Sequence, residues 1–349
     1  MADGVTARSP GRVNLIGEHT DYNGGMVLPA ALSVGLDVTL VPRAEPVATI
    51  ESAGHDFPAE RRLDEAATGH WSDTALGAVQ QANTLGLIHG GAHLSIRSTI
   101  PAGSGLSSSA ALIVAILKAA RGVSGGSFDD KQLAVAARQV ENDFLGVPCG
   151  IMDQMAVALA TPGTAMALDT NSLDYSLVNL PKSHAMVVIH SGVTRQLTDG
   201  RYKERKLECD AAKAHFETDD LCLLEPETIK ASTLSNPAKR RALHCASENA
   251  RVLAAVAALQ NGHIAQFGTL MTESHASMRD LFEISLPPID ALVESAVELG
   301  AVGARLTGGG FGGCIVVCVA SDKQAQWQSD LLARHSDARF IDAVSGHSI

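Results

Sequence analysis

Ionisable side chains crowd into one short glycine-bounded segment, "GRVNLIGEHTDYNGG", at residues 11–25. Its apolar residues indicate a strand, and the glycine that follows them indicates a turn. Three ionisable groups come within four positions of each other directly after that turn: Glu18, His19 and Asp21. Arg12 stands alone just upstream. These residue types predict a turn that carries a dense set of fixed hydrogen-bond donors and acceptors.

A second segment, "IPAGSGLSSSAAL" at residues 100–112, places small residues and three serines directly before an apolar helix. Glycines let backbone amides approach an anion, and the start of a helix presents free N–H groups to negative charge. The chain has no GxxxxGK[ST] motif, so the segment would hold a phosphate without the lysine of that motif. Taken alone, it fits a phosphate site and a serine-rich helix cap equally well.

A third glycine cluster, "LTGGGFGGC" at residues 306–314, contains the spacing GxGxxG. A dinucleotide-binding fold requires a helix after that loop and an acidic residue about 20 positions further on. Here a strand-like run, "CIVVCV", follows, and position 333 is Ala. We therefore reject a nicotinamide site and expect a tight turn that packs against another loop.

The elements around these motifs alternate between strand and helix patterns. Residues 27–43 and 92–100 alternate apolar with polar positions, as half-buried strands do. We expect a helix from Ser107 to Gly122, a capped helix within residues 128–146, and mostly helical structure from 237 to 299. The order predicts an α+β protein with mixed or antiparallel sheets and two domains, 1–180 and 181–349.

Composition excludes several classes of protein. The chain has 349 residues, 46% of them hydrophobic, which is enough to bury one large core or two ordinary ones. A net charge of −11 argues against nucleic acid or an anionic membrane as the main partner. The six cysteines are scattered, no apolar run could span a bilayer, and the first residues show no signal peptide. We expect a cytoplasmic monomer that acts on small molecules.

Together the three motifs carry a family resemblance. Residues 11–25 resemble the signature of the galactokinases, and the other two segments are similar to the second and third motifs of the GHMP small-molecule kinases. A fourth segment, residues 141–154 ("ENDFLGVPCGIMDQ"), also resembles the galactokinase pattern. The second and third motifs occur in mevalonate and homoserine kinases too, so only the first and fourth point beyond the superfamily. The resemblance implies a two-domain GHMP kinase fold with the active site in the cleft between the domains.

The resemblance implies transfer of the γ-phosphoryl group of ATP to the C1 hydroxyl of galactose. A hexose offers a ring of hydroxyl groups, and selecting one epimer requires many fixed hydrogen-bonding partners. The implied sugar-binding residues are Glu18, His19, Asp21, Gly150, Asp153 and Tyr202. Of these, Asp153 matches the catalytic carboxylate, either as a general base or as a group that orients the C1 hydroxyl. Arg12 matches the arginine beside it, which favours the ionised carboxylate and stabilises the transferring phosphoryl group.

The remaining implied residues concern ATP and Mg²⁺. Ser109 and Glu141 match the Mg²⁺ ligands, and Trp71 matches a tryptophan near the nucleotide. The residues that would cradle the ATP phosphates are Gly103, Ser104, Gly105, Leu106, Ser107, Ser108 and Ser109. Phosphoryl transfer needs mainly positioning and neutralisation of charge, and this set supplies both.

Two alternatives stay open at this point. A related GHMP sugar kinase that acts on N-acetylgalactosamine or arabinose would share the catalytic residues and differ around the sugar. A non-catalytic sensor of galactose and ATP would bind both ligands without turnover. The intact "GLSSSAA" segment, Glu141 and Asp153 argue against the sensor.

Overall fold

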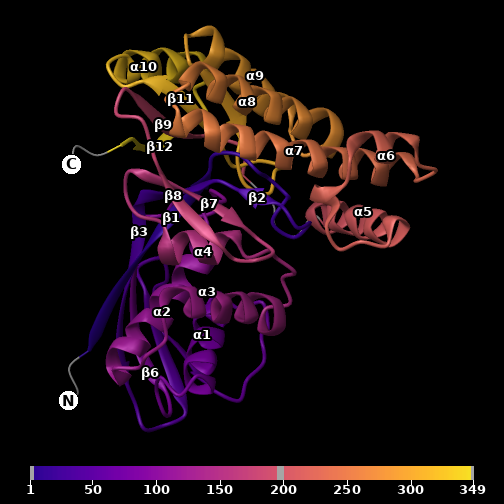
Figure 1. Ribbon diagram of the computed structural model, residues 1–349. Coiled ribbons are helices and arrows are strands. Elements are labelled where there is room, and N and C mark those ends of the chain that lie inside the picture. Colours follow the sequence, from indigo (N-terminus) through magenta and orange to yellow (C-terminus); the bar gives the residue numbers. More distant parts are fainter. Residues whose placement is uncertain (1–3, 195–199, 347–349) are drawn as a thin grey trace. The chain divides into compact units, whose positions relative to one another are not determined.

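The computed structural model describes residues 4–194 and 200–346, and it divides into two compact units (Figure 1). Unit 1 contains the chain up to Arg12, then Ser33–Pro101 and Leu106–Leu159. Unit 2 contains Val13–Leu32, Ala102–Gly105 and the chain from Ala160 onward. Each unit is thus assembled from separate stretches of sequence, and the boundary that we placed after residue 180 stays a prediction.

Unit 1 combines a mixed sheet with a layer of helices. Its strands are β1 (Val5–Asn14) up to Arg12, β3 (Pro29–Pro42) from Ser33, β4 (Val47–Ser52), β5 (Ala59–Arg62) and β6 (Ala92–Ser98). Strand β6 pairs antiparallel with β3 and parallel with β4, and β5 closes this edge antiparallel to β4. The mixed sheet that the sequence predicts is therefore confirmed.

Helices pack beside this sheet and position the residues of the second and fourth motifs. They are α1 (Asp73–Thr84), α2 (Ser108–Ser124), α3 (Asp130–Gln139), the π-helix η1 (Val140–Phe144) and α4 (Met152–Leu159). Helix α3 begins with a capping box in which Asp129 accepts from the Gln132 N–H and Gln132 accepts from the Asp129 N–H. Helix α2 passes the predicted end at Gly122 and stops at Ser124, because Gly125 adopts the left-handed conformation (φ 67°) that ends helices.

Unit 2 contains a small strand group and a four-stranded antiparallel sheet. Strand β7 (Thr164–Asp169) pairs antiparallel with β2 (Met26–Val27) and β8 (Tyr175–Asn179). The second sheet has the order β10-β11-β9-β12, from Gly303–Leu306, Cys314–Ala320, His184–His190 and Arg339–Val344. Strands β10 and β11 flank the third motif, so the predicted strand, glycine loop and strand are confirmed.

The helices of unit 2 include those expected between residues 237 and 299. They are α5 (Arg201–Phe216), η2 (Leu221–Leu223), α6 (Pro226–Ala231), α7 (Asn236–Gln260), α8 (Ile264–Ser277), η3 (Met278–Phe282), α9 (Pro287–Glu298) and α10 (Gln324–Arg334). Helices α7 and α8 pack side by side (Figure 1), and the core of unit 2 includes buried side chains of α7, α9, β9 and β11. Among the described residues, no helix combines the length and apolar composition needed to cross a membrane.

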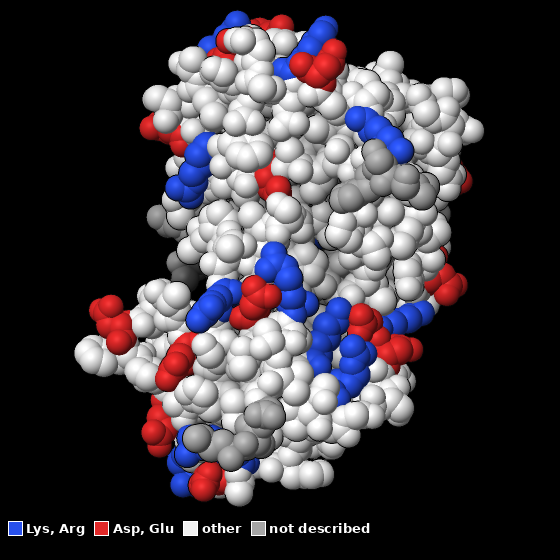
Figure 2. Space-filling view, turned by 90° about the vertical axis from the view of Figure 1, so that its left-hand side faces the viewer, with Lys and Arg blue, Asp and Glu red and all other residues white. Residues whose placement is uncertain are grey.

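Charged side chains of both signs intermingle on the molecular face drawn in Figure 2. Although the net charge is −11, lysine and arginine side chains on this face lie in clusters beside acidic residues. Exposed pairs of this kind contribute little to stability, typically about 0–1 kcal/mol each. The charged residues of unit 2 that matter for its structure are buried inside the unit.

Helix α7 has a buried polar face, which is unusual for a helix that packs on a core. His244 and Glu248, one helical turn apart, are both fully buried. The Nε2 of His244 lies 3.1 Å from the backbone oxygen of Glu18, and its Nδ1 lies 2.8 Å from the Ser277 hydroxyl. A carbonyl oxygen can only accept, so Nε2 carries the proton and the neutral imidazole accepts from Ser277. Burial lowers the pKa of His244 to about 4, which keeps this imidazole neutral.

The neutral His244 makes the fold sensitive to acid. Its contribution to stability is complete above pH 6.5 and is lost as the pH falls towards 4, because the unfolded chain binds the proton more readily. The loss is on the order of 3 kcal/mol. We expect His244→Gln, which cannot titrate, to flatten the fall of Tm between pH 6.5 and 4 in thermal melts followed by circular dichroism. His263→Gln, at an exposed position, should keep the wild-type slope; an unchanged slope in His244→Gln would refute this assignment.

Candidate active site

The first motif forms a turn that only glycine can begin. Leu15 and Ile16 are fully buried and exchange backbone hydrogen bonds with Leu28, which fixes the chain up to position 16. Gly17 then adopts φ +103°, and a Cβ there would lie 2.8 Å from the Met26 carbonyl oxygen. A side chain is excluded by both the dihedral angle and the space. The turn therefore brings the next residues to a defined position.

Glu18 points into the interior of unit 2. Its side chain is 2% exposed, and its carboxylate accepts from the amide of Asn14 (2.7 Å) and from the Gly308 N–H (2.7 Å). The Thr307 hydroxyl (3.2 Å) and the guanidinium of Arg305 also donate to it. Burial raises the pKa of Glu18 above its usual value, while Arg305 and the Gly308 N–H act in the opposite direction.

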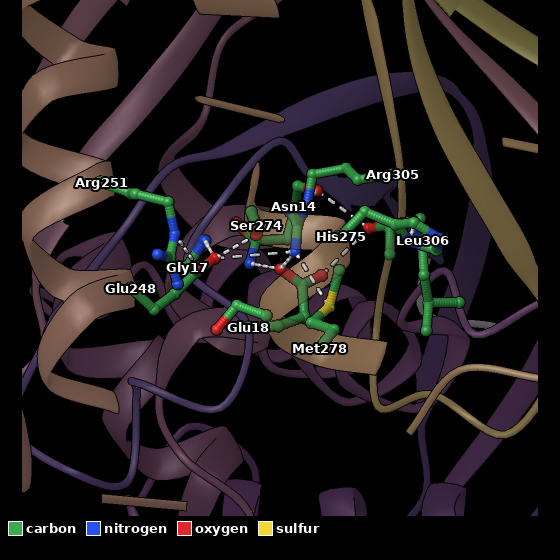
Figure 3. Close-up of polar contacts among 12 residues, drawn as sticks. Asn14, Gly17, Glu18, Glu248, Arg251, Ser274, His275, Met278, Arg305 and Leu306 are labelled. Carbon is green, nitrogen blue, oxygen red and sulfur yellow. Dashed lines mark hydrogen bonds and ion pairs between the residues drawn. The ribbon is translucent and has the colours of Figure 1, made fainter. Parts of the chain in front are cut away.

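Helix α7 supports the same turn from beneath. The Oε1 of Glu248 accepts from the Gly17 N–H (3.0 Å) and from the Ser274 hydroxyl (2.5 Å), and its Oε2 accepts from Arg251 (2.8 Å). Burial opposes the charge on Glu248, but its cationic neighbours outweigh that effect and lower its pKa to about 2. Figure 3 shows Glu248 and Arg251 reaching from this helix towards Gly17.

Sequence reasoning missed these supporting residues. The turn is separated along the chain by some 230 to 290 positions from Arg305, Glu248 and His244. No feature of the first motif indicates that these residues are its partners. The available signal was the polar pair His244 and Glu248 at i, i+4 spacing within a helical segment. The second signal was a charged residue, Arg305, within the short buried strand "GARL".

Aromatic side chains surround His19, which the sequence assigns to the sugar site. Its Nδ1 lies 2.7 Å from the Tyr22 hydroxyl, and its ring stacks on Phe282 at 4.5 Å between centroids. Tyr202, from the first turn of α5, lies 5.4 Å from the same ring. Two predicted sugar residues distant in sequence are thus neighbours, and Asp21 is half-buried in the same turn. The segment 195–199 that leads to Tyr202 lies outside the described residues.

In unit 1, Asp153 is held by an arginine and a serine. The Nε and Nη2 of Arg12 donate to its two carboxylate oxygens at 2.9 and 3.0 Å, a bidentate arrangement. The hydroxyl of Ser107 donates to Oδ2 at 2.5 Å. The side chain of Arg12 is 5% exposed and that of Asp153 is 31% exposed, so the carboxylate is fixed from the inside and accessible from the outside. Gly150, three residues before Asp153, is buried.

Glu141 occupies a π-helix, where the sequence predicted the middle of an α-helix. The π-helix η1 is the kind of irregularity often found at functional sites. Glu141 is buried, and its carboxylate accepts from the hydroxyl of Ser109, from Gln154 and from the Cys149 thiol. Burial raises its pKa, and the nearby charge of Asp153 acts in the same direction. The structure thus brings together the two oxygen ligands that the sequence predicts for Mg²⁺.

The serine segment before α2 has a backbone shaped by left-handed residues. Gly103 (φ 69°), Gly105 (φ 74°) and Ser107 (φ 63°) all adopt positive φ, and α2 begins at Ser108. Such alternation can turn successive N–H groups towards one side, as anion-binding nests do. Leu106 is buried and accepts from the Arg12 N–H, while Gly103 and Ser108 are exposed.

Within unit 2, the third motif packs on the start of this serine segment. A Cβ at Gly308 would lie 3.3 Å from the Gly105 oxygen, and one at Gly313 would lie 3.2 Å from the Ser104 oxygen. The Cys314 thiol also donates to the Ser104 oxygen at 3.4 Å. The expected packing of the glycine turn against another loop is confirmed.

Trp71 lies just before α1, and an imidazole covers one face of its indole. The ring of His55 stacks on Trp71 with centroids 3.8 Å apart and an interplanar angle of 12°. The sequence places Trp71 near the nucleotide, and the structure leaves that assignment a prediction. Its stacking partner His55 was not foreseen from the sequence.

Three family models match the chain. The galactokinase galactose-binding signature matches residues 2–41, the GHMP kinases N terminal domain matches 71–161, and the GHMP kinases C terminal model matches 255–329. A galactokinase of Roseiflexus sp. (strain RS-1) is 40% identical over 352 residues, covering 96% of this chain and 88% of that protein.

Solved structures agree with these matches. The galactokinase of Lactococcus lactis, solved in complex with galactose, is 31% identical, with a TM-score of 0.93, covering 99% of this chain and 95% of that one. The mevalonate kinase of Methanococcus jannaschii, at 19% identity and a TM-score of 0.71 over 99% of both chains, shares the fold. Because the relatedness extends over almost the whole length and includes the galactose-binding signature, this chain belongs to the galactokinase family of the GHMP kinases.

Proposed function

We propose that this protein transfers the γ-phosphoryl group of ATP to the C1 hydroxyl of galactose, forming galactose 1-phosphate and ADP. The observation that carries the proposal is the Asp153 carboxylate, gripped by Arg12 and Ser107 and open on one side, in a chain that contains the galactose-binding signature. A fixed, partly exposed carboxylate is the group that could accept a proton from a hydroxyl or orient it for attack. Galactose is the sugar named both by that signature and by the Lactococcus lactis complex.

In this proposal Asp153 orients or deprotonates the attacking sugar hydroxyl, and Arg12 compensates negative charge. The bidentate grip of Arg12 fixes both oxygens of Asp153, so the carboxylate loses little entropy when a hydroxyl approaches. The Ser107 hydroxyl fixes Oδ2 in addition. The guanidinium also offers positive charge where the phosphoryl group carries negative charge in the transition state.

Sugar recognition is assigned to the first motif and to the end of the fourth. In unit 2, His19, Asp21 and Tyr202 offer polar atoms to the sugar hydroxyls, and Glu18 fixes the inner side of the turn that bears them. In unit 1, the buried backbone at Gly150 serves the sugar beside Asp153.

ATP is assigned to the serine segment, residues 103–109, and to Trp71. Positive φ at positions 103, 105 and 107 suits a segment whose amides receive phosphate oxygens. Ser109 and Glu141 suit Mg²⁺, since both offer hard oxygen ligands and already lie in contact. Two protein ligands are enough for this ion, which keeps several waters and binds the substrate phosphates. When bound, Mg²⁺ would neutralise phosphate charge.

A sugar panel tests the proposal directly. With ATP and Mg²⁺, we expect ADP release with galactose and at least about tenfold lower kcat/KM with N-acetylgalactosamine, arabinose and glucose. Mevalonate and homoserine serve as controls for the wider superfamily. Galactose 1-phosphate is identified by mass spectrometry. Turnover of mevalonate without turnover of galactose would refute the proposal, and binding of galactose and ATP without ADP release would indicate a sensor.

Charge removal at Asp153 tests the chemical step. We expect Asp153→Asn to lower kcat by about 10²- to 10⁴-fold, the usual contribution of a general base, while galactose affinity changes little. Arg12→Met should also lower kcat, and the double variant should lose less than the product of the two losses, because Arg12 acts partly through Asp153. Asp143→Asn, on the exposed side of η1, is the matched control. Near-normal turnover of Asp153→Asn would remove it from the mechanism.

Glu141→Gln tests the metal assignment without opening a cavity. The loss of one charged oxygen ligand should raise the Mg²⁺ concentration needed for half-maximal rate by about tenfold or more and should lower kcat. Galactose affinity, measured by calorimetry in the absence of nucleotide, should stay constant. If Glu141→Gln has the Mg²⁺ dependence of the wild type, its carboxylate serves only the contacts with Ser109, Gln154 and Cys149.

A further inference from the structure

Arg305 is a fully buried cation in β10. Its Nη2 donates to the Glu18 carboxylate and lies 3.3 Å from the Met278 sulfur, and its Nη1 donates to the backbone oxygen of Asn14 at 3.3 Å. The second carboxylate nearby, that of Glu248, lies 3.9 Å from Nη2 and is occupied with Gly17, Ser274 and Arg251. Glu18 is therefore the direct counter-ion of Arg305 (Figure 3).

The Glu18 carboxylate is the point at which the first and third motifs meet inside unit 2. It holds Asn14 of the first motif together with Thr307 and Gly308 of the third. The third motif in turn lies against the oxygens of Ser104 and Gly105, which belong to the second. A displacement of this carboxylate would therefore be transmitted to the turn before His19 and to the start of the serine segment.

An ion pair at this position is not explained by stability. Moving two charges out of water costs several kcal/mol per ion, and apolar residues of similar size are often as stable or more stable. The pair is useful where orientation matters, because one rigid guanidinium donates through Nη2 to Glu18 and through Nη1 to the backbone oxygen of Asn14, and so fixes the two relative to each other. Glu18 accepts from an N–H, an amide and a hydroxyl besides Arg305, and it can do so with both oxygens only while it is ionised.

We propose that Arg305 is a positioning residue of the kinase reaction, which holds Glu18 ionised and directed at Thr307 and Gly308 and so sets the first and third motifs against the serine segment. This inference rests on the proposed function for the reaction that it serves. It assigns to Arg305 a role through Glu18, without contact with either substrate.

Other charged groups face the pair and must be considered in a test that uses pH. They are Glu248, Arg251 and His244 from α7, His275 from α8 and Asp290 from α9. Burial lowers the pKa of both histidines to about 4, so that they stay neutral between pH 5.5 and 8. Arg305 also contributes to lowering the pKa values of both histidines and of Glu248, so the test compares Arg305→Met with the same change in a Glu18→Gln background, which isolates the response of Glu18.

The first test measures thermal unfolding against pH, and it needs no substrate. In Arg305→Met, Glu18 loses its cation, so its folded-state pKa should rise further above the unfolded value. A carboxyl group with a raised folded-state pKa contributes stability at low pH and loses it as the pH rises through that pKa. We therefore expect the Tm deficit of Arg305→Met relative to wild type to grow from pH 5.5 to 8. With Glu18→Gln as the background, the same deficit should be independent of pH.

The second test measures kinetics with galactose and ATP. Arg305→Lys keeps the charge and loses the fork, so we expect near-wild-type Tm but at least a tenfold loss of kcat at saturating substrates. Glu18→Gln leaves Arg305 buried without its counter-ion, so the double variant Glu18→Gln/Arg305→Met should lose no more kcat than the worse single variant. Arg334→Met removes an exposed arginine of unit 2 that pairs with Glu298 and is the control, with kcat expected within about threefold of the wild type.

The outcomes are separable. A pH-independent Tm deficit in Arg305→Met, or normal kcat in a folded Arg305→Lys, would overturn the proposal and leave Arg305 with a role in packing alone. Multiplicative losses in the double variant would overturn the role through Glu18. A wild-type protein that does not phosphorylate galactose would refute the proposed function, while the melting test would still decide whether Arg305 controls the ionisation of Glu18.

Discussion

The buried ion pair between Glu18 and Arg305 is the constraint on which the first and third motifs depend. A carboxylate inside a protein must have its charge and its lone pairs satisfied. Here the chain satisfies them with a cation from β10 and with donors from Asn14 and the Thr307–Gly308 turn. The glycine-rich loop between β10 and β11 thus has a fixed start. Helix α7 completes the arrangement by binding the Gly17 N–H and the Glu18 carbonyl oxygen.

Unit 1 uses its buried charges differently. Arg12 is enclosed while Asp153 remains partly exposed, so a buried cation holds a carboxylate that solvent can reach. Glu141 is nearly enclosed, and its charge is disfavoured by burial and by the proximity of Asp153. A divalent cation at Ser109 and Glu141 would reverse that penalty, because it would compensate the charge that burial opposes. Unit 2 therefore satisfies the Glu18 carboxylate internally, whereas in unit 1 the internal donors to Asp153 leave that carboxylate partly exposed.

Much of the architecture follows from local signals, and the supporting contacts do not. The capped helix that begins after Asp129 and the strand after the glycine cluster are encoded by neighbouring residues, so the sequence alone predicted them. The predicted end of α2 at Gly122 was wrong, because that glycine serves close packing: a Cβ there would lie 2.7 Å from the Val5 side chain. Arg305 and Glu248 could not be assigned, since their partners lie in another part of the chain and depend on tertiary packing. The π-helix at Glu141 was not predicted either, because its composition resembles that of an ordinary helix.

Ser107 shows what the site requires of the backbone. This serine adopts φ 63° directly before α2, in a region where a side chain costs energy and glycine costs almost none. Selection for stability alone would favour glycine at this position, and glycine would remove the hydroxyl that donates to Asp153. The strained serine is therefore a compromise in which some folding stability is given up for a hydrogen bond to the carboxylate of Asp153.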